Sequence, residues 1–195
     1  NFEIIKHITN PNATEVLYED TTIKVSSFPL FHRVPTTGFL FEEQTKLKKL
    51  HADNCKKHNI PFTHYTDLKR GKDYHSADGK VIIKNSELTI ENLSPISYAY
   101  CSDTMYDQRV IDAIKGVDLV YHEATFMHDK LKRAEETMHS TALQAGMVAK
   151  AAEAKQLIIG HFSSRYDSLE ELLAETRSES ENSFIAYEGE RFTRE

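Results

Sequence analysis

Short apolar stretches bounded by polar turn residues predict β-strands in the first part of the chain. The strand-type segments are Phe2–Lys6, Glu15–Tyr18, Thr22–Ser26 and Gly38–Glu42. The polar pair Glu19-Asp20 separates the second of them from the third. This part of the chain is therefore expected to contribute short strands to a sheet.

From residue 96 onward, short apolar runs alternate with segments of helical character. The apolar runs predict strands at Ile96–Cys101, Val117–His122, Gln156–Gly160 and Ser183–Tyr187. The segments between them predict helices at Gln108–Lys115, at Thr141–Ala154 and from Ser168 to Arg177, with capping boxes opened by Thr141 and by Ser168. Strands that alternate with helices indicate an α/β layered architecture.

Between these two parts lies a basic segment with a weaker pattern. Leu47 and Leu50 predict a short helix that ends near His58, and an irregular polar region follows it. Asp78-Gly79 predicts a hairpin turn that leads into Val81–Ile83.

Composition places the chain among globular domains. It has 195 residues, of which 39% are hydrophobic and 28% charged, so it can bury a core and does not read as disordered. No apolar run approaches the roughly 20 residues that a membrane-spanning helix needs. The first residues lack a secretory pattern, and the two cysteines, Cys55 and Cys101, lie far apart. A reducing, cytoplasmic setting is therefore expected.

The distribution of charge changes the picture given by the net charge of −6. Between Gln44 and Lys84 there are ten Lys or Arg and four Asp, so this stretch carries +6 and the rest of the chain −12. Such asymmetry is typical of a segment that binds a polyanion. A solvated helix face with no partner explains it equally well, so both interpretations stay open at this point.

Candidate chemistry collects at the predicted strand ends. Asp103 follows one strand, His122-Glu123 ends the next, and His161 follows a third. His and Asp side chains brought together from separate strand ends are the usual ligands of Zn²⁺ or Mn²⁺. A single His after a strand is more often structural, so the indication comes from several such motifs in one chain.

Five motifs occur in one order: H-R-V-P-T-x-G-F from His32, S-D-T around Asp103, H-E-A-T-F from His122, H-S-T from His139 and H-x-S-x-R-Y from His161. This order resembles the C-terminal half of ribonuclease Z, a tRNA 3′-end endonuclease of the metallo-β-lactamase superfamily. The resemblance implies a metallo-β-lactamase αββα sandwich of which residues 1–195 are the C-terminal portion. It also implies removal of 3′ trailers from precursor tRNA by two-metal hydrolysis, a homodimer, and no membrane association.

The resemblance also implies residue roles. His32 and His161 would each ligate one of two divalent metals, most simply zinc, and Asp103 would bridge them. His139 would act as general acid on the leaving 3′ oxygen, and Glu123 would orient it.

Two further residues near these motifs receive roles from the same comparison. Arg165 would bind the scissile phosphate. His122 is expected to be buried and structural.

The metal site is expected to be incomplete. The H-x-H-x-D-H loop of the family is absent from the sequence, and by family pattern it lies N-terminal to Phe2. The isolated chain is therefore predicted to bind metal poorly and to be inactive as a nuclease. The absent half would also cover one face of the sheet, so an apolar face is expected to be left uncovered.

The basic segment resembles the inserted arm with which ribonuclease Z holds tRNA. The arm is predicted to span residues 45–84, with RNA contacts at Lys56, Lys57, Lys69 and Arg70. It departs from the family at Ile60-Pro61, where a Gly-Pro motif is expected.

Two alternatives remain. One is another hydrolase of the same superfamily, such as a phosphodiesterase or an arylsulfatase relative. The other is a non-catalytic module for RNA binding or dimerisation.

Overall fold

A computed structural model describes residues 6–44, 47–91 and 94–192 of the chain. The chain divides into two compact units. Unit 1 combines Asn1–Glu42 with Ile96–Glu195, and unit 2 is the intervening Glu43–Pro95. The predicted basic segment, 45–84, lies inside unit 2, although its first two residues are outside the described part. The strand predicted at Phe2–Lys6 lies outside the described residues except for Lys6.

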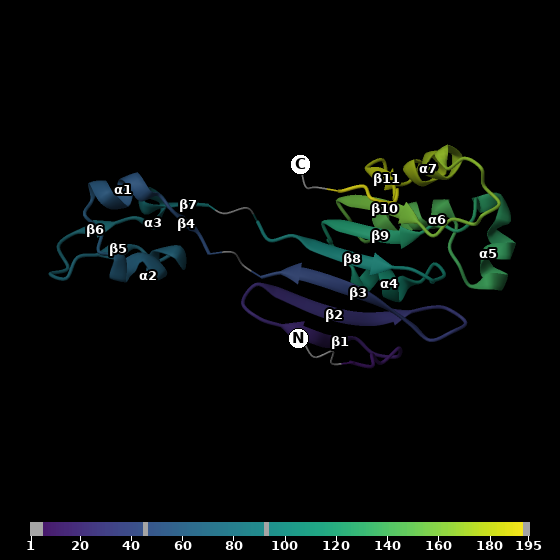
Figure 1. The fold of residues 1–195 in the computed structure, drawn as a ribbon, viewed down its shortest axis with the longest axis horizontal. Helices are drawn as coiled ribbons and strands as arrows, with labels where there is room; N and C mark the ends of the chain where they lie inside the picture. Colours follow the sequence, from purple (N-terminus) through teal and green to yellow (C-terminus); the bar gives the residue numbers. More distant parts are fainter. Residues whose placement is uncertain (1–5, 45–46, 92–93, 193–195) are drawn as a thin grey trace. The chain divides into compact units, whose positions relative to one another are not determined.

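Unit 1 is built on one sheet. Among the described residues its seven strands follow the order β1-β2-β3-β8-β9-β10-β11 (Figure 1). Their bounds are β1 Glu15–Glu19, β2 Ile23–Leu30, β3 Thr36–Glu43, β8 Ser97–Cys101, β9 Leu119–Glu123, β10 Gln156–Gly160 and β11 Ser183–Ile185. The strands β8, β9, β10 and β11 are mutually parallel, whereas β3 runs antiparallel to β8. The α/β architecture predicted from the sequence is confirmed.

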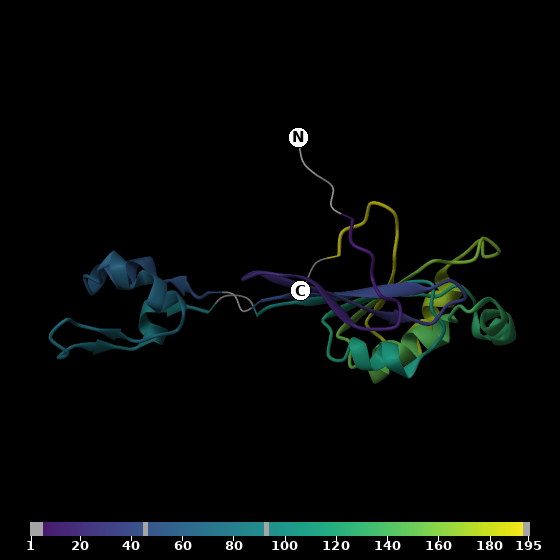
Figure 2. The same ribbon diagram turned by 90° about the horizontal axis from the view of Figure 1, so that it is seen from below.

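Helices α4, α6 and α7 of unit 1 lie together on one face of this sheet (Figure 2), whereas α5 lies beyond the ends of the strands (Figure 1). The bounds of the helices are α4 Gln108–Ala113, α5 Leu131–Thr137, α6 Ala142–Ala151 and α7 Glu170–Arg177, with a short 3-10 turn at His128–Lys130 before α5. The predicted capping box is present at the start of α6, because Thr141 accepts from the Gln144 N–H and Gln144 reaches back to the Thr141 N–H. Such a cap stabilises a helix by about 1 kcal/mol.

The main core lies between the sheet and these helices. Val120 and Leu157 from the strands and Val148 and Leu172 from the helices have no exposed surface. Each such side chain contributes roughly 1.5–3 kcal/mol when it leaves water. The core fixes β9 and β10 against α6 and α7, and it thereby sets where the ends of those strands lie.

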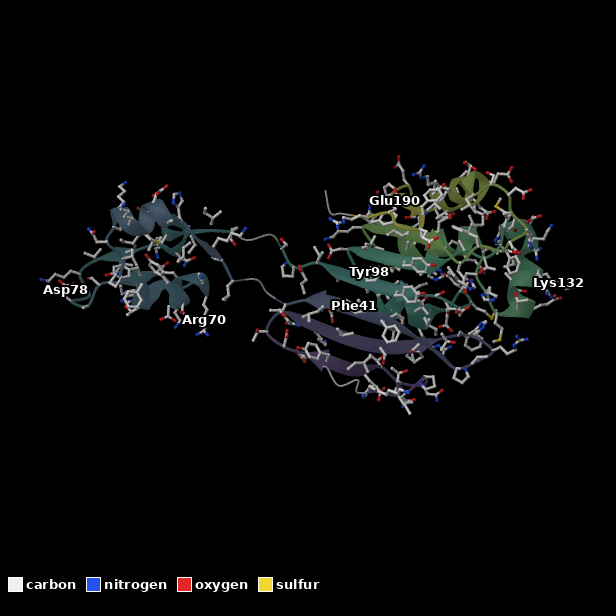
Figure 3. The ribbon with its side chains drawn as sticks, in the orientation of Figure 1. Phe41, Arg70, Asp78, Tyr98, Lys132 and Glu190 are labelled. Atoms are coloured by element: carbon white, nitrogen blue, oxygen red, sulfur yellow. The ribbon has the colours of Figure 1, made fainter. Side chains whose placement is uncertain are left out.

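The opposite face of the sheet carries aromatic rings. Ala99 is in the core, so its neighbours Tyr98 and Tyr100 must point to the other side. Tyr98 stacks with Phe41 at a centroid distance of 5.8 Å (Figure 3), and Tyr100 stacks with Tyr121 at 4.9 Å. Within the described residues this face is crossed only by the segments before β1 and after β11, not by helices (Figure 2).

Unit 2 has an apolar core of its own, formed by Cys55, Ile60, Leu68, Ile83 and Leu88. Its elements are β4 Lys49–Leu50, α1 Ala52–Lys57, a 3-10 turn Phe62–His64, α2 Tyr65–Lys69, β5 Tyr74–His75, β6 Ile82–Ile83, α3 Asn85–Leu88 and β7 Thr89–Ile90. The predicted hairpin turn is present, because β5 pairs antiparallel with β6 and Gly79 has a φ of 68°.

Three local predictions were wrong. The helix expected from Leu47 begins only at Ala52, because Lys49–Leu50 pairs with β7 instead. The region expected to be irregular contains α2, which is held by burial of Leu68. Ser168 does not open a capping box, since α7 begins after Leu169 without a side-chain cap and Ser168 bonds to Glu170.

In the described part of the chain, no helix has the length and apolar character required to cross a membrane.

Candidate active site

The parallel strands β8, β9 and β10 end at the same edge of the sheet (Figure 1). Asp103 follows β8, Glu123 is the last residue of β9, and His161 follows β10. Asp103 and His161 both have left-handed backbones, with φ of 60° and 57°. That conformation costs a non-glycine residue on the order of 1 kcal/mol and is concentrated at functional sites.

Four side chains converge at this edge. Asp103, Glu123, His139 and His161 each offer a ligand atom, and these atoms lie within 4.8 Å of one another. His161 Nε2 is 3.4 Å from Asp103 Oδ1. His139 reaches the cluster from the turn between α5 and α6. The sequence motifs therefore identified residues that the fold brings together.

Glu123 is fully buried and saturated with hydrogen bonds. Its carboxylate accepts from the Thr104 N–H at 2.6 Å, the Thr125 hydroxyl at 2.5 Å, the Ser140 N–H at 3.2 Å and His139 Nδ1 at 3.0 Å. Burial is the largest influence on its pKa and raises it, but the bonds from His139, Thr125 and Thr104 outweigh burial and hold the pKa below its usual value. Glu123 is thus a buried carboxylate that stays ionised.

The pKa of His139 is shifted in the opposite direction to that of Glu123. Its hydrogen bond to Glu123 raises the pKa of the imidazole above its usual value, although burial works against this. The negative charge of Asp103 raises the pKa further, whereas Arg33 lowers it. Because Nδ1 bonds to Glu123, the other ring nitrogen, Nε2, is free to face the other residues of the cluster.

The two outer histidines are oriented in a similar way. His32 Nδ1 lies 2.9 Å from the carbonyl oxygen of Met138, which has a left-handed φ of 60°. A carbonyl only accepts, so Nδ1 carries the proton. His161 Nδ1 lies 3.0 Å from the Thr125 hydroxyl. In both rings Nε2 is therefore available as a metal ligand.

The three imidazoles form a row. The ring centroids of His32 and His139 are 4.9 Å apart, and those of His139 and His161 are 5.2 Å apart. His32 thus lies at one end of the row, next to the four-residue cluster but outside it.

Arg165 lies close to the same row. Its guanidinium is 4.8 Å from the centre of the Phe126 ring, whose edge faces His139 at a centroid distance of 6.4 Å. Its Nε donates to the Ser163 hydroxyl at 3.0 Å. The side chain is exposed, so it can meet an anion from solvent.

His122 has the structural placement expected of it. It is fully buried, and burial lowers the pKa of its imidazole, so it stays neutral. Its Nδ1 bonds to the Glu123 carbonyl at 2.8 Å, while Nε2 has no partner among the described residues.

The sequence did not reveal the backbone groups that set this geometry. The Met138 carbonyl and the Ser140 N–H carry no residue-specific signal, because any residue has them. Thr104 lies within the S-D-T motif, but its N–H bond to Glu123 depends on how the turn after β8 folds.

The predicted RNA contacts of unit 2 also have a common character. Lys56, Lys57, Lys69 and Arg70 are all exposed (Figure 3 labels Arg70), and none forms an ion pair with a described residue. By contrast, ion pairs with acidic residues of unit 2 neutralise the lysines Lys48, Lys72, Lys80 and Lys84. The four predicted contacts are therefore available to a polyanion.

No protein-family model matches the chain. Curated relatives do. The chain is 42% identical over 188 residues to a protein named ribonuclease Z from Phocaeicola vulgatus, covering 96% of this chain and 60% of that protein. It is 38% identical over 192 residues to a ribonuclease Z from Parabacteroides distasonis, covering 98% of this chain and 63% of that protein.

Solved structures show the same fold. The metallo-β-lactamase fold protein YhfI from Bacillus subtilis matches with a TM-score of 0.56 at 16% identity, covering 91% of this chain and 51% of that one. The short form of human tRNase Z matches with a TM-score of 0.50 at 21% identity, covering 89% of this chain and 44% of that one.

The chain is therefore a homologue of ribonuclease Z along almost its whole length, with part of a metallo-β-lactamase fold. It spans about 60% of the length of the curated relatives it matches.

Proposed function

We propose that this chain carries one part of a two-metal endoribonuclease site that removes 3′ trailers from precursor tRNA. The proposal is supported by homology to proteins named ribonuclease Z. The observation that carries it is the pair of buried Glu123 and half-buried His139, which lies beside Asp103 and His161 at the edge of the sheet.

The donor set fits divalent metals. His32 and His161 offer Nε2, and Asp103 offers a carboxylate, which is the nitrogen and oxygen chemistry that zinc accepts. When bound, two such ions supply Lewis-acid activation of a phosphodiester and of the attacking water. We assign these three residues as the ligands that this chain contributes.

Glu123 is assigned to positioning rather than to metal. Its oxygens already accept four hydrogen bonds, two of them from backbone N–H groups of Thr104 and Ser140. Giving them to a metal would leave buried donors unsatisfied, which costs about 1–3 kcal/mol each. The carboxylate instead holds the ring of His139.

His139 is assigned as the general acid. The charge of Glu123 favours the protonated imidazole, and the ring presents Nε2 to the row of ligands. From there a proton can pass to the 3′ oxygen that leaves when the trailer is cut. Arg165, exposed beside Phe126, would bind the scissile phosphate through its planar fork of donors.

Unit 2 is proposed to bind the tRNA. Lys56, Lys57, Lys69 and Arg70, which form no ion pair with a described residue, can neutralise phosphates and so give affinity that does not depend on sequence. A homodimer rests on the resemblance to ribonuclease Z alone and stays a prediction. A cytoplasmic location, expected from the cysteines and the first residues of the sequence, stays a prediction too.

The isolated chain is predicted to be inactive, because it contributes three ligands to a site for two metals. Incubating it with a precursor tRNA and added Zn²⁺ or Mn²⁺ should give no trailer removal. Robust turnover by this chain alone would contradict the assignment of an incomplete site.

The function itself is tested in a protein that carries this chain within the full length of its relatives. His139→Ala should slow trailer removal by about 10²–10⁴-fold, the usual contribution of a general acid. His7→Ala, at an exposed position outside the site, is the matched control and should cut at the wild-type rate. If the wild type leaves precursor tRNA intact but hydrolyses simple phosphodiesters, another hydrolase of the superfamily is the better assignment.

A further inference from the structure

Unit 1 contains a pocket of about 300 Å³ beside the row of imidazoles. It is formed by the loop before β1, the segment after β2 and the first turn of α4. Its lining includes Asn12, Phe31, His32, Arg33 and Arg109. His32 therefore belongs both to the candidate metal site and to the wall of this pocket.

The pocket has two arginines in its wall. Arg33 is exposed and forms no ion pair with any described residue. Arg109 forms an ion pair with Asp107, to which it donates through Nε at 2.9 Å and one Nη at 2.6 Å, and its second Nη has no described partner. Its guanidinium also lies over the Phe31 ring, 5.3 Å from the ring centroid. Asp107 offsets one of the two arginines, so one positive charge remains to favour an anion.

Part of the remaining lining is apolar, beside the polar residues Asn12, His32 and Thr36. Pro11, Pro29 and Pro35 contribute rigid hydrocarbon surface, and Phe31 adds an exposed aromatic ring. Asn12 contributes an amide that can both donate and accept. Paired cations with an apolar wall and one amide match a nucleotide, whose phosphate, ring faces and base edge need these three kinds of group.

Hydrogen bonds connect the wall of the pocket to the candidate active site. The Phe31 N–H donates to the Thr104 hydroxyl at 3.1 Å, and the Met105 N–H donates to the Phe31 carbonyl at 2.9 Å. These bonds tie the segment after β2 to the turn that carries Asp103.

We propose that this pocket is a subsite for the RNA nucleotide next to the scissile phosphate, with Arg33 and Arg109 binding that nucleotide's phosphate. This inference rests on the proposed function, because it takes single-stranded RNA as the ligand. The apolar wall holds the base or ribose, and the Asn12 amide meets a base edge. The strand would then pass from this pocket along the row His32–His139–His161.

The test measures binding to this chain, so it does not depend on a complete metal site. The probe is a short fluorescent single-stranded oligouridylate, followed by anisotropy over a range of salt concentrations. Lys56→Glu, Lys57→Glu, Lys69→Glu and Arg70→Glu are introduced together in the background, so that unit 2 does not contribute to affinity.

In that background Arg33→Ala and Arg109→Ala should each weaken binding by about tenfold, because each removes a charge-assisted hydrogen bond to phosphate. Each should also reduce the slope of log affinity against log salt by less than about 0.7, which is the value for the one phosphate that the two arginines share on a single strand. Arg33→Lys should restore the slope, because it restores the charge. Arg133→Ala, at an exposed arginine of α5, is the control and should bind as the background does.

Uridine 5′-monophosphate should displace the probe at lower concentration than inorganic phosphate, because only the nucleotide fills the apolar wall. Affinities of Arg33→Ala and Arg109→Ala equal to that of Arg133→Ala would overturn the proposal. Equal competition by inorganic phosphate would overturn it too, in favour of a plain anion site. Failure of the full-length protein to cut precursor tRNA would refute the proposed function, and this separate readout distinguishes the two failures.

Discussion

At the scale of single residues, the candidate site depends on which ring nitrogen of each histidine is hydrogen-bonded within the protein and which one faces the site. The motifs supplied His32, His139 and His161 from the sequence alone. They could not supply the partners of the three Nδ1 atoms, which are the Met138 carbonyl, Glu123 and the Thr125 hydroxyl. A backbone carbonyl in a left-handed turn leaves no mark in the sequence, so the direction in which each ring points required the structure.

Glu123→Gln tests whether both oxygens of the buried carboxylate are needed to accept the surrounding hydrogen bonds. The amide must place its NH₂ group against one of the N–H donors that now meet an oxygen, such as that of Thr104 or Ser140. The expected loss in the free energy of unfolding is about 1–3 kcal/mol, measured by urea denaturation. Glu135→Gln, at an exposed position of α5, should change it by less than about 0.5 kcal/mol. Equal effects of the two variants would contradict the saturation of Glu123.

The Glu123–His139 pair also predicts a pH dependence for the metal-free chain. The pKa of Glu123 is lowered, so its contribution to stability is present above its ordinary value of 4.5 and is lost as pH falls through the folded value. The pKa of His139 is raised, so its contribution is present below its ordinary value of 6.5 and is lost as pH rises through the folded value.

The pair should therefore stabilise the fold most between those two values. The difference in melting temperature between the wild type and His139→Gln should be largest near pH 5.5, since glutamine keeps a donor but not the charge, and should shrink on either side. A difference that stays constant from about pH 5 to pH 9 would show that no charged pair forms.

At the scale of elements, periodicity predicted the strands of the sheet in unit 1 but not all the elements of unit 2. β10 was predicted with its observed bounds, because Gln156–Gly160 is a buried apolar run between clear breaks. The helix expected near Leu47 was wrong because β4 pairs with β7, and that partner lies about 40 residues further along the chain. Pairing over such a distance has no local signal.

Asp118 links three strands at the end of the sheet opposite the candidate site. Its carboxylate accepts from the Ser97 N–H at 2.8 Å and from Lys155 Nζ at 2.6 Å, so it joins the starts of β8 and β10 to that of β9. Asp118→Ala should lower the free energy of unfolding by about 1–3 kcal/mol in urea denaturation. Asp112→Ala, on the exposed face of α4, serves as the control; similar losses in both variants would show that Asp118 does not join these strands.

At the scale of the whole molecule, motif order identified the fold and the relatives, whereas the extent of unit 2 needed the structure. The predicted arm ends at residue 84, but unit 2 continues to Pro95 because α3 and β7 complete its core. The pocket beside His32 likewise draws on three segments far apart in sequence. Proximity of that kind is a property of the folded chain.

Charge reversal in unit 2 tests its proposed role in the full-length protein. Lys56→Glu with Lys57→Glu should weaken binding to precursor tRNA and flatten its salt dependence, by up to about 0.9 in slope for each phosphate that the variant no longer neutralises. Lys72→Glu with Lys80→Glu makes the same change in net charge at lysines already paired with Asp67 and Asp78, and it should have a smaller effect. Equal effects of the two double variants would mean that only net charge matters.

The most direct measurement is the rate at which the full-length protein removes the 3′ trailer of a precursor tRNA, with and without Asp103→Asn. Asp103 would be one of the metal ligands, so the isosteric loss of its charge should slow cleavage by at least about 100-fold. Asp112→Asn, on the exposed face of α4, should cut at the wild-type rate. Cleavage by Asp103→Asn at the rate of Asp112→Asn, or a wild type that leaves the precursor intact, would contradict the account.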